Sequence, residues 1–465
     1  MAFSRRRYGD DPYLAAQLVQ ESPWRPGRVF GRVNNVADRP VKSLVMAAGM
    51  STRMKSARPK VLHEVCGKAI LSHVLDACRG AGIPEQIVIV GAMRDQVMAA
   101  YADAKDITWV VQDPQRGTGH AVMVAQESLA GFKGDLVVLV GDAPMIRPET
   151  VRTLLATHRR EGAAATLITA ILDDPKWFGR IVRDAAGNVR RIVEAKDAAP
   201  DERAIREVNP SYYAFRWPAL QKVLGRITDN NVKKEYYLTD AIALLIEAGE
   251  KAMGIPAAEP EEVEAVNSRE DLAHVTALMR RRILRAHMAA GVTVVDPATT
   301  YIDVSVEIGQ DTVIEPCTVI GGPAQIGRNC RVGPLAHLRP GTVLEDGAEA
   351  GTFVETKNAR LGANVCARHL AYLGDADVGP RTNIGCGTIT ANSDREGKKH
   401  RTKIGADASI GAGTVLVAPT EVGDGAQTGA GSVVTKAHPV PPGETYAGVP
   451  AKPLKATRKR RGAPK

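Results

Sequence analysis

An apolar residue recurs at every sixth position through much of the C-terminal half of this 465-residue chain. One unbroken series comprises Ile308, Ile314, Ile320, Ile326, Val332, Leu338 and Leu344. A later series comprises Ile404, Ile410, Leu416, Val422, Thr428 and Val434. A period of six fits neither an α-helix nor the alternation of a simple strand. It predicts a β-helix in which three short strands make one turn and each of these residues points inward.

The segment 391–402 breaks this period and is rich in charged residues. A regular coil has no room for such a segment, so we predict that it leaves the coil as a loop. Insertions in stacked repeats tend to lie on one face, which is often the functional one.

The N-terminal half has a different pattern, with strand-like and helix-like stretches in alternation. Apolar runs at 43–47, 86–90, 108–111 and 136–140 are separated by stretches such as 70–79 and 119–129 that favour helix. This order predicts a parallel sheet covered by helices on both faces. The charged stretch 268–290 then carries apolar residues at Leu272, Val275, Leu278 and Ile283, which predicts a helix linking the two halves.

The net charge of +9 is concentrated at the two ends of the chain. Residues 1–40 carry seven Arg and four acidic residues, and 451–465 carry seven Lys or Arg and no acidic residue. We therefore expect solvated, disordered tails and no specific nucleic-acid site. The six cysteines form no CxxC pair, which argues against a disulfide scaffold or a zinc ribbon and fits a cytoplasmic protein. The sequence contains no apolar run of about 18 residues, so no membrane span is predicted.

A loop rich in small residues follows the first apolar run. It reads Val-Met-Ala-Ala-Gly-Met-Ser-Thr-Arg over 45–53, and Pro59-Lys60 comes shortly after it. Small residues let a backbone approach a nucleotide, and exposed N–H groups can hold phosphates. Arg53 and Lys60 supply the positive charge that a triphosphate and a pyrophosphate leaving group require. The Walker A pattern is absent, so the sequence predicts a phosphate-binding loop of another kind.

With these residues the chain resembles the sugar nucleotidyltransferases. Over 41–450 it resembles the bifunctional enzymes that make UDP-N-acetylglucosamine by acetylating glucosamine 1-phosphate and then transferring a uridylyl group to the product. The resemblance implies a Rossmann-like nucleotidyltransferase domain followed by a left-handed parallel β-helix. The expected parts are a disordered extension (1–40), a uridylyltransferase domain (41–267), a linker helix (268–291), an acetyltransferase β-helix (292–450) and a basic disordered tail (451–465).

The resemblance implies a substrate site in the first domain. Its residues are Met46, Ala47, Ala48, Gly49, Gln112, Gly117, Thr118, Val140, Gly141, Asp142, Gly179, Glu194, Asn209 and Asn267. Gln112 would read the uracil edge, while Asp142 and Asn267 would coordinate Mg²⁺, which prefers hard oxygen ligands. Arg53 and Lys60 would be the catalytic cations. Those that would contact N-acetylglucosamine 1-phosphate are Gly179, Glu194 and Asn209.

The implied reaction is in-line attack of the sugar 1-phosphate on the α-phosphorus of UTP, with release of pyrophosphate. It needs positioning and charge neutralisation and no general base, so we expect His120 to serve packing. The sequence departs from the family at three places in this half. Ser51 replaces a loop glycine, Val140 replaces a tyrosine, and Pro210-Ser211 replaces Thr-Gly after Asn209.

In the coils, the resemblance makes His369 the base that takes a proton from the attacking amine, for which imidazole is suited near neutral pH. The residues implied to hold the sugar phosphate and sugar are Arg339, Lys357, Tyr372 and Asn383. Those implied to contact acetyl-CoA are Cys386, Asn392, Ser393, Ala412 and Ala430. Here Ser393 stands in place of a tyrosine, Ala412 of a serine and Gly448 of an arginine. The family also implies a homotrimer whose acyltransferase sites lie between neighbouring coils, and a product used for peptidoglycan and lipopolysaccharide.

Three other functions compete with this interpretation. A γ-type carbonic anhydrase is also a β-helix, but His337, His369, His400 and His438 form no H-x₄-H pair for zinc. A monofunctional nucleotidyltransferase would use the β-helix only to form trimers, and the departures at the coenzyme site would produce it. A regulatory protein that only binds sugar nucleotides would not need the retained Asp142 and Asn267.

Overall fold

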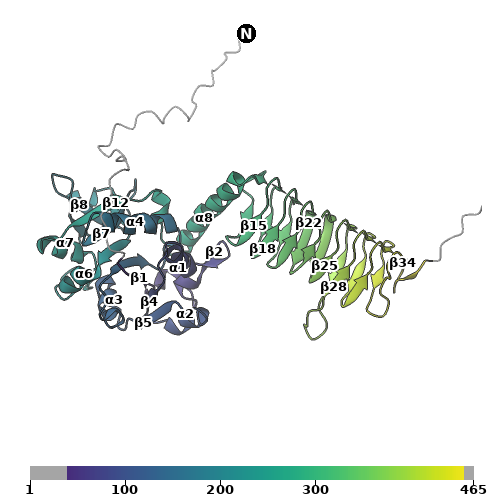
Figure 1. Ribbon diagram of the computed structural model, residues 1–465, viewed down its shortest axis with the longest axis horizontal. Helices are drawn as coiled ribbons and strands as arrows, with labels where there is room; N and C mark the ends of the chain where they lie inside the picture. The colour runs from purple at the N-terminus through teal and green to yellow at the C-terminus, as the bar shows by residue number, and fades with distance from the viewer. Residues whose placement is uncertain (1–38, 455–465) are drawn as a thin grey trace, which may run out of the picture. The chain divides into compact units, whose positions relative to one another are not determined.

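The computed structural model describes residues 39–454 (Figure 1). Most of the expected extension over 1–40, and the expected tail from 455 onward, lie outside these residues. Strand β35 (Lys452–Pro453) pairs with β34 (Thr445–Ala447), so strand pairing continues past residue 450. Within the described part of the chain, no helix is long and apolar enough to span a bilayer.

The N-terminal half contains a ten-stranded sheet in the order β5-β4-β1-β6-β11-β7-β10-β8-β9, with β12 beside β7. Strands β1 (Val41–Met46), β4 (Gln86–Val90), β5 (Ile107–Val111) and β6 (Asp135–Val140) are parallel to one another, as predicted. The rest are β7 (Ala165–Ile171), β8 (Gly179–Arg183), β9 (Val189–Val193), β10 (Glu207–Asn209), β11 (Tyr213–Arg216) and β12 (Ala252–Pro256). Most of their pairings are antiparallel, which the alternation of strands and helices did not predict.

Helices cover both faces of this sheet because successive strand residues point to opposite sides. On β1, Leu44 packs in one buried cluster and Val45 in the other. The helices are α1 (Ile70–Gly80), α2 (Arg94–Ala100), α3 (Thr118–Val124), α4 (Pro148–Arg160), α5 (Pro200–Arg203), α6 (Trp217–Leu224) and α7 (Asp240–Glu247). A two-stranded hairpin, β2 (Glu64–Val65) with β3 (Lys68–Ala69), precedes α1.

The predicted linker helix is α8 (Arg269–Ala289). It begins with a capping box, in which the Ser268 hydroxyl accepts a hydrogen bond from the Asp271 N–H (3.1 Å) and the Asp271 carboxylate accepts one from the Ser268 N–H (2.9 Å). Its apolar side, including Val275, Leu278 and Ile283, is buried in the same cluster as the interior of the coils. The cluster also contains Met54, Val65 and Met145, so burial against both halves of the protein explains the amphipathic pattern.

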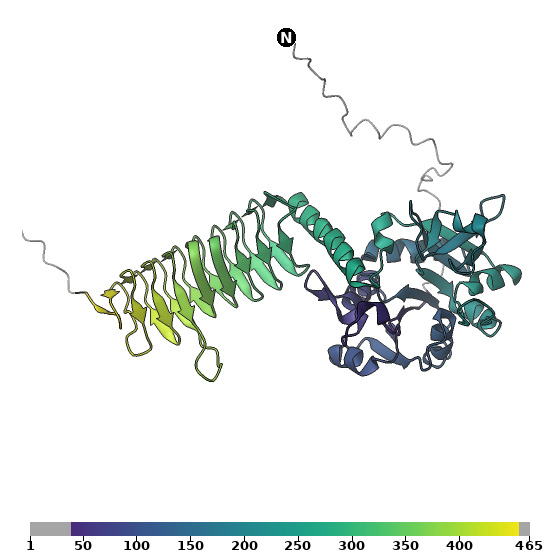
Figure 2. The ribbon, with the colours of Figure 1, turned by 180° about the vertical axis from the view of Figure 1, so that it is seen from behind.

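The coils stack short strands in three columns (Figures 1 and 2). The first holds β15 (Val306–Ile308), β18 (Ala324–Ile326), β21 (Thr342–Leu344), β23 (Arg360–Leu361), β25 (Ala376–Val378), β28 (Thr402–Ile404) and β31 (Thr420–Val422). The second holds β13 (Thr293–Val294), β16 (Val313–Ile314), β19 (Arg331–Val332), β26 (Asn383–Ile384), β29 (Ser409–Ile410), β32 (Gln427–Thr428), β34 and β35. The third holds β14 (Tyr301–Ile302), β17 (Val319–Ile320), β20 (His337–Leu338), β27 (Ile389–Ala391), β30 (Val415–Val417) and β33 (Val433–Val434). The long strands β22 (Glu349–Lys357) and β24 (Cys366–Gly374) run through both of the last two columns.

The six-residue pattern matches the interior of the coils. Every member of the two predicted series is buried except Ile308, which is half-buried in an early coil. Neighbouring turns are in register at intervals of 18 residues, as in the pairing of Ile320 with Leu338. Each turn therefore places three such residues inside, as the period predicts.

The segment 391–402 leaves the stack between β27 and β28, as predicted, and folds on itself. Ser393 and Lys399 form an antiparallel bridge. The Asp394 carboxylate accepts hydrogen bonds from the backbone N–H groups of Glu396 (3.0 Å) and Lys398 (2.9 Å), and lies 2.8 Å from His400 Nε2. The insertion is therefore an ordered hairpin held by one aspartate.

Adjacent residues of β30 test the role of the inward positions. Leu416 is fully buried and its neighbour Val417 is 37% exposed. We expect Leu416→Ala to lower the free energy of unfolding by about 2–5 kcal/mol, because it leaves a cavity in a stacked interior. Val417→Ala should cost less than about 1 kcal/mol. Urea unfolding followed by circular dichroism measures both, and equal losses would contradict the inward assignment.

Candidate active sites

The predicted nucleotide loop lies at the carboxyl edge of two adjacent strands, β1 and β6. The Gly141 N–H donates a hydrogen bond to the Met46 carbonyl (2.9 Å). A Cβ on Gly141 would lie 3.0 Å from that oxygen, so this close approach favours glycine. Met46–Gly49 and Asp142 are thereby brought side by side, at the edge where parallel α/β sheets bind ligands.

Lys60 joins three separate segments at this edge. Its ammonium lies 2.5 Å from Asp142 Oδ2 and 3.0 Å from Asn267 Oδ1. Arg53 Nη2 also lies 3.0 Å from Asn267 Oδ1. Lys60 is only 9% exposed, and a buried charge requires such partners. The structure thus brings together both predicted metal ligands and both predicted catalytic cations.

The oxygens of Asp142 and Asn267 fit a divalent cation. A carboxylate and an amide oxygen both point at one position, which the Lys60 ammonium holds, and such hard oxygens suit Mg²⁺. Asn267 is itself fixed, since its backbone N–H donates to Asp271 Oδ2 (3.0 Å) at the start of α8. Over 39–454 there is no group of three or more His, Cys, Asp or Glu placed to hold a metal.

The structure explains how Ser51 can replace the glycine that the family has at this position. Its backbone is left-handed (φ 58°), the conformation that glycine adopts most readily. Its hydroxyl accepts a hydrogen bond from the Lys60 N–H (3.2 Å) and donates one to the Gly49 carbonyl (3.2 Å). The side chain therefore ties the phosphate loop to the segment that carries Lys60.

Gln115 is a contact that the sequence reasoning missed. Its side-chain amide donates a hydrogen bond to the Ala48 carbonyl, so it braces the predicted nucleotide loop. Nothing in its sequence context marks it, because the contact joins residues 67 positions apart.

Gln112 is buried beside the turn that carries Gly117. Its side-chain amide donates to the Gly117 carbonyl (2.9 Å) and lies 3.1 Å from His120 Nδ1. Burial lowers the pKa of His120, in keeping with a packing role for a neutral imidazole. Gly117 has φ +99°, and a Cβ there would lie 2.6 Å from the Tyr236 carbonyl oxygen. Thr118 closes the turn by accepting from the Leu238 N–H (3.0 Å).

The three residues predicted to contact the sugar phosphate are neighbours. Asn209 on β10 is opposite Gly179 on β8. A Cβ on Gly179 would lie 3.7 Å from Glu194 Oε1. Asn209 is buried and donates to the Tyr213 hydroxyl (2.7 Å). Ser211, which stands where the family has glycine, is left-handed (φ 64°) and its N–H donates to Asn209 Oδ1 (3.2 Å).

The remaining departure in this half, Val140, ends β6 and packs half-buried against one core cluster. Its aliphatic side chain offers no hydrogen-bonding group to a substrate, unlike the family tyrosine.

His369 lies on β24 and is exposed to solvent. It is paired with Thr352 on β22, and no residue in the described range forms a hydrogen bond with its imidazole. Tyr372, three positions on, is opposite Glu355. Arg339 Nη1 lies 3.0 Å from Glu355 Oε1. Glu355 was not predicted as a site residue, although it belongs to the motif that contains Lys357.

Tyr372 and Asn392 meet across Gly374. A Cβ on Gly374 would lie 2.5 Å from the Tyr372 hydroxyl and 2.6 Å from Asn392 Nδ2. Asn392 donates to Asp375 Oδ2 (2.5 Å), and Asn358 donates to the other oxygen of Asp375 (2.7 Å). A carboxylate accepts hydrogen bonds and does not donate them, so the Asn392 amide turns its nitrogen toward Asp375 and its oxygen away from it. Lys357 and Gly374 are opposite each other in the same pair of strands.

Three of the predicted acetyl-CoA residues, Cys386, Ala412 and Ala430, follow one corner of the stack, in the turns between the second and third columns. The Cys386 carbonyl accepts from Gly413, and the Ala412 carbonyl accepts from Gly431, both at 2.7 Å. A Cβ on Gly411 would lie 2.7 Å from the Ala430 N–H, so the Ala412 and Ala430 turns are stacked. Ser393 begins the hairpin next to Asn392. The structure therefore does not place Asn392 and Ser393 at the corner of Cys386, because they follow β27 and Cys386 precedes it. Asn383 pairs with Cys366 and Ser409 in the second column, whereas Tyr372 pairs with Ile389 in the third.

Gly448 has φ +93° and its carbonyl accepts from the Val433 N–H (3.0 Å). The left-handed backbone favours glycine at this position, where the family has an arginine.

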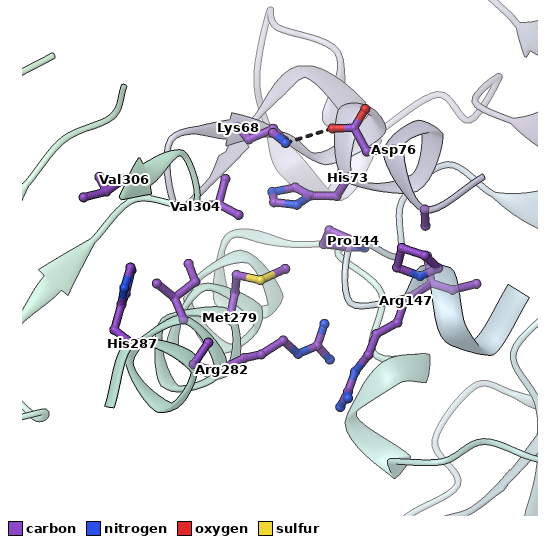
Figure 3. Close-up of a pocket in the computed structure, with 15 residues that line it drawn as sticks. Lys68, His73, Asp76, Pro144, Arg147, Met279, Arg282, His287, Val304 and Val306 are labelled. Atoms are coloured by element: carbon purple, nitrogen blue, oxygen red, sulfur yellow. Dashed lines mark hydrogen bonds and ion pairs between the residues drawn. The ribbon is translucent and has the colours of Figure 1, made fainter. Parts of the chain in front are cut away.

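A cavity of about 450 Å³ lies beside the loop that follows Asp142 (Figure 3). Its wall includes Pro144, Met279 and Arg282, and none of the predicted site residues lines it. Arg282 Nη1 donates to the Met145 carbonyl (2.8 Å), so α8 braces the loop that carries Asp142. The cavity is a feature of this support and not of the predicted substrate sites.

The raised pKa of Glu194, which is one of the residues predicted to contact the sugar phosphate, can be tested through the pH dependence of stability. Burial raises the pKa of its carboxyl, so the folded protein retains this proton at a pH where the unfolded chain has lost it. Ionised Glu194 therefore costs stability as pH rises above about 4.3, the usual value for Glu. We expect Glu194→Gln to raise the melting temperature little at about pH 4 and more at about pH 8. The matched change at the exposed Glu444 should have the same small effect at both, and a pH-independent effect of Glu194→Gln would contradict the burial argument.

Comparison with known proteins agrees with the two-part architecture. A model of the MobA-like NTP transferase domain matches residues 43–207, and a model of the bacterial transferase hexapeptide (six repeats) matches 305–340 and 401–436. The bifunctional protein GlmU of Pelobacter propionicus is 42% identical over 430 residues, which cover 85% of this chain and 93% of that protein. The bifunctional protein GlmU of Streptomyces coelicolor is 43% identical over 444 residues, which cover 88% and 91%. The chain therefore belongs to the GlmU family of bifunctional transferases, with a nucleotidyltransferase domain followed by a hexapeptide-repeat domain.

Proposed function

We propose that this protein makes UDP-N-acetylglucosamine in two steps at two separate sites. The coils transfer an acetyl group from acetyl-CoA to glucosamine 1-phosphate, and the α/β domain then transfers a uridylyl group from UTP to the product. The observation that carries the proposal is the meeting of Arg53, Lys60, Asp142 and Asn267 at the carboxyl edge of β1 and β6. These groups provide what a reaction between two phosphates needs, which is positive charge and oxygen ligands for a metal ion.

In the uridylyl step, a phosphate oxygen of the sugar phosphate forms a bond to the α-phosphorus of UTP, and the bond from that phosphorus to the bridging oxygen breaks. Pyrophosphate leaves with the electron pair. Arg53 and Lys60 neutralise negative charge on the phosphates, and the backbone of 46–49 approaches the nucleotide. Asp142 and Asn267 would hold Mg²⁺, which, when bound, offsets phosphate charge. Gln112 would hydrogen-bond the uracil, while Gly179, Glu194 and Asn209 would hold the sugar.

In the acetyl step, the amine nitrogen of glucosamine 1-phosphate attacks the thioester carbon of acetyl-CoA, and the carbon–sulfur bond breaks. His369 takes the proton from the nitrogen, and the departing thiolate is protonated. Arg339 and Lys357 would bind the sugar phosphate. Asp375 would orient Asn392 toward the acetyl group, since it holds the amide nitrogen.

A homotrimer would complete the acetyl sites. Leu335, Phe353 and Leu370 stack at one corner of successive coils, and they are 46%, 57% and 57% exposed. Such a row of large apolar side chains favours contact with another chain. Because His369 is next to Leu370, a second copy packed on this corner would also cover the catalytic base. The family resemblance further supports a cytoplasmic enzyme whose product is a precursor of peptidoglycan and lipopolysaccharide.

The direct test is synthesis by the purified full-length protein. We expect glucosamine 1-phosphate, UTP and Mg²⁺ to give UDP-N-acetylglucosamine only when acetyl-CoA is added, with mass spectrometry as the readout. N-acetylglucosamine 1-phosphate should give product without acetyl-CoA. Product from the acetylated substrate alone would show that the coils lack acetyl transfer, as in a monofunctional nucleotidyltransferase.

The two steps should be separable by single substitutions. We expect His369→Ala to lower acetyl transfer by about 10²–10⁴-fold, the usual contribution of a general base, and to leave uridylyl transfer in place. Asp142→Asn should have the opposite pattern, and a mixture of the two variants should restore the full sequence. Loss of both steps in either variant, with unchanged melting temperature, would contradict two independent sites.

A further inference from the structure

Trp177 is an exposed aromatic residue two positions before Gly179. It is 78% exposed, whereas Trp217 is fully buried. Large exposed aromatic side chains are uncommon and often mark a binding surface. Among residues 39–454, its ring takes part in no aromatic pair, cation–π contact or hydrogen bond, so its exposed position calls for another explanation.

Hydrogen bonds from the buried Arg180 side chain hold the backbone of the loop that carries Trp177. The guanidinium of Arg180, which is 5% exposed, donates hydrogen bonds to the carbonyls of Phe178 and Lys176, the latter at 3.3 Å. Its Nε is 3.4 Å from the Arg203 carbonyl. Lys176 itself is left-handed (φ 42°), a conformation that costs about 1–2 kcal/mol in a residue with a side chain. A buried arginine therefore fixes the backbone on both sides of Trp177, and the indole extends from this backbone to the surface.

Trp177 shares a small recess with the sugar side of the uridylyl site. The recess has a volume of about 60 Å³ and is lined by Trp177, Glu194, Ala195, Lys196 and Lys233. Glu194 is also within reach of Gly179, as a Cβ there would lie 3.7 Å from its Oε1. The recess therefore adjoins the residues proposed to hold the sugar phosphate.

The groups in this recess suit a phosphorylated sugar. An indole ring offers a flat apolar face with negative charge density, which attracts the polarised C–H groups of a pyranose. A carboxyl group binds hydroxyl or amide N–H donors, and an ammonium group binds phosphate. Apolar contact together with a few placed polar groups is the usual composition of a small-molecule site.

We propose that Trp177 forms the aromatic wall of the sugar subsite and packs against the ring of N-acetylglucosamine 1-phosphate in the uridylyl reaction. This inference rests on the proposed function, since it assumes the sugar phosphate as substrate. The buried Arg180 acts as a positioning residue that presents the indole. Trp177 thus contributes to KM for the sugar phosphate and not to the binding of UTP.

The test is steady-state kinetics of the full-length protein with variants at Trp177. We expect Trp177→Ala to raise KM for N-acetylglucosamine 1-phosphate by about three- to tenfold, the usual effect of one aromatic contact. KM for UTP should stay within about twofold, and Trp177→Phe should recover most of the loss because it restores an aromatic face. The control is Trp109→Phe on β5, where the half-buried ring packs near Tyr101 with a centroid distance of 6.3 Å.

Fluorescence gives a second readout that a purely structural role would not change. Titration of the wild type with N-acetylglucosamine 1-phosphate should shift the indole emission to shorter wavelength as an exposed ring is covered. Trp109→Phe should keep this response and Trp177→Phe should lose it. Unchanged KM in Trp177→Ala, or an unchanged response in Trp177→Phe, would overturn the inference while uridylyl transfer by the wild type stands. Absence of product in the wild type itself would instead refute the proposed function, and the inference with it.

Discussion

The position of one buried ammonium group determines how the first site is assembled. Lys60 lies between Asp142 and Asn267, which come from the end of β6 and from the residue before the capping box of α8. A charge this buried needs oxygen partners, and here both of these oxygens face it, so the three segments meet at Lys60. The parallel pairing of β1 with β6 brings the segments that follow these two strands to one edge of the sheet. The capping box at Ser268 fixes the third segment, which carries Asn267. The helix that leads into the coils therefore starts at the nucleotide site.

The second site depends on repetition. Because a regular turn takes 17 or 18 residues, side chains far apart in sequence become neighbours on successive coils, as Ile320 and Leu338 or Thr352 and His369 do. Where the turn is interrupted, by the hairpin between β27 and β28, Asn392 is placed against Asp375 and beside Tyr372. The regular stack sets the distance between side chains on successive coils, and the hairpin that interrupts it places the polar side chain of Asn392. This division explains how His369, the proposed catalytic base, can be exposed on a regular scaffold.

Periodic features were predictable from sequence, and contacts with no period were not. The apolar residues at every sixth position predicted the interior of the coils, and the apolar runs that alternate with helical stretches predicted the parallel strands β1, β4, β5 and β6. The family resemblance predicted Asp142 as a metal ligand, and the structure places it beside the loop that follows β1. The antiparallel strands after β6 were missed because their order depends on tertiary pairing. Gln115 and Glu355 were missed for a similar reason, since each acts through a partner far away in sequence or on another coil.

Two serines show how a departure from a family pattern can keep its geometry. Ser51 and Ser211 both adopt left-handed backbones where the family has glycine, and each forms hydrogen bonds next to a proposed binding residue. The cost of that conformation in a residue with a side chain is about 1–2 kcal/mol. These bonds offset part of this cost, which explains how the loops keep their shape.

We expect Asp142 and Asn267 to exchange the Lys60 ammonium for a divalent ion when nucleotide binds, as the phosphates then neutralise Lys60. Electron paramagnetic resonance with Mn²⁺, in the presence of UTP, measures this directly. The account predicts a bound Mn²⁺ in the wild type and an affinity weaker by about tenfold or more in Asp142→Asn. Unchanged Mn²⁺ affinity in that variant would contradict the claim and would place the metal elsewhere.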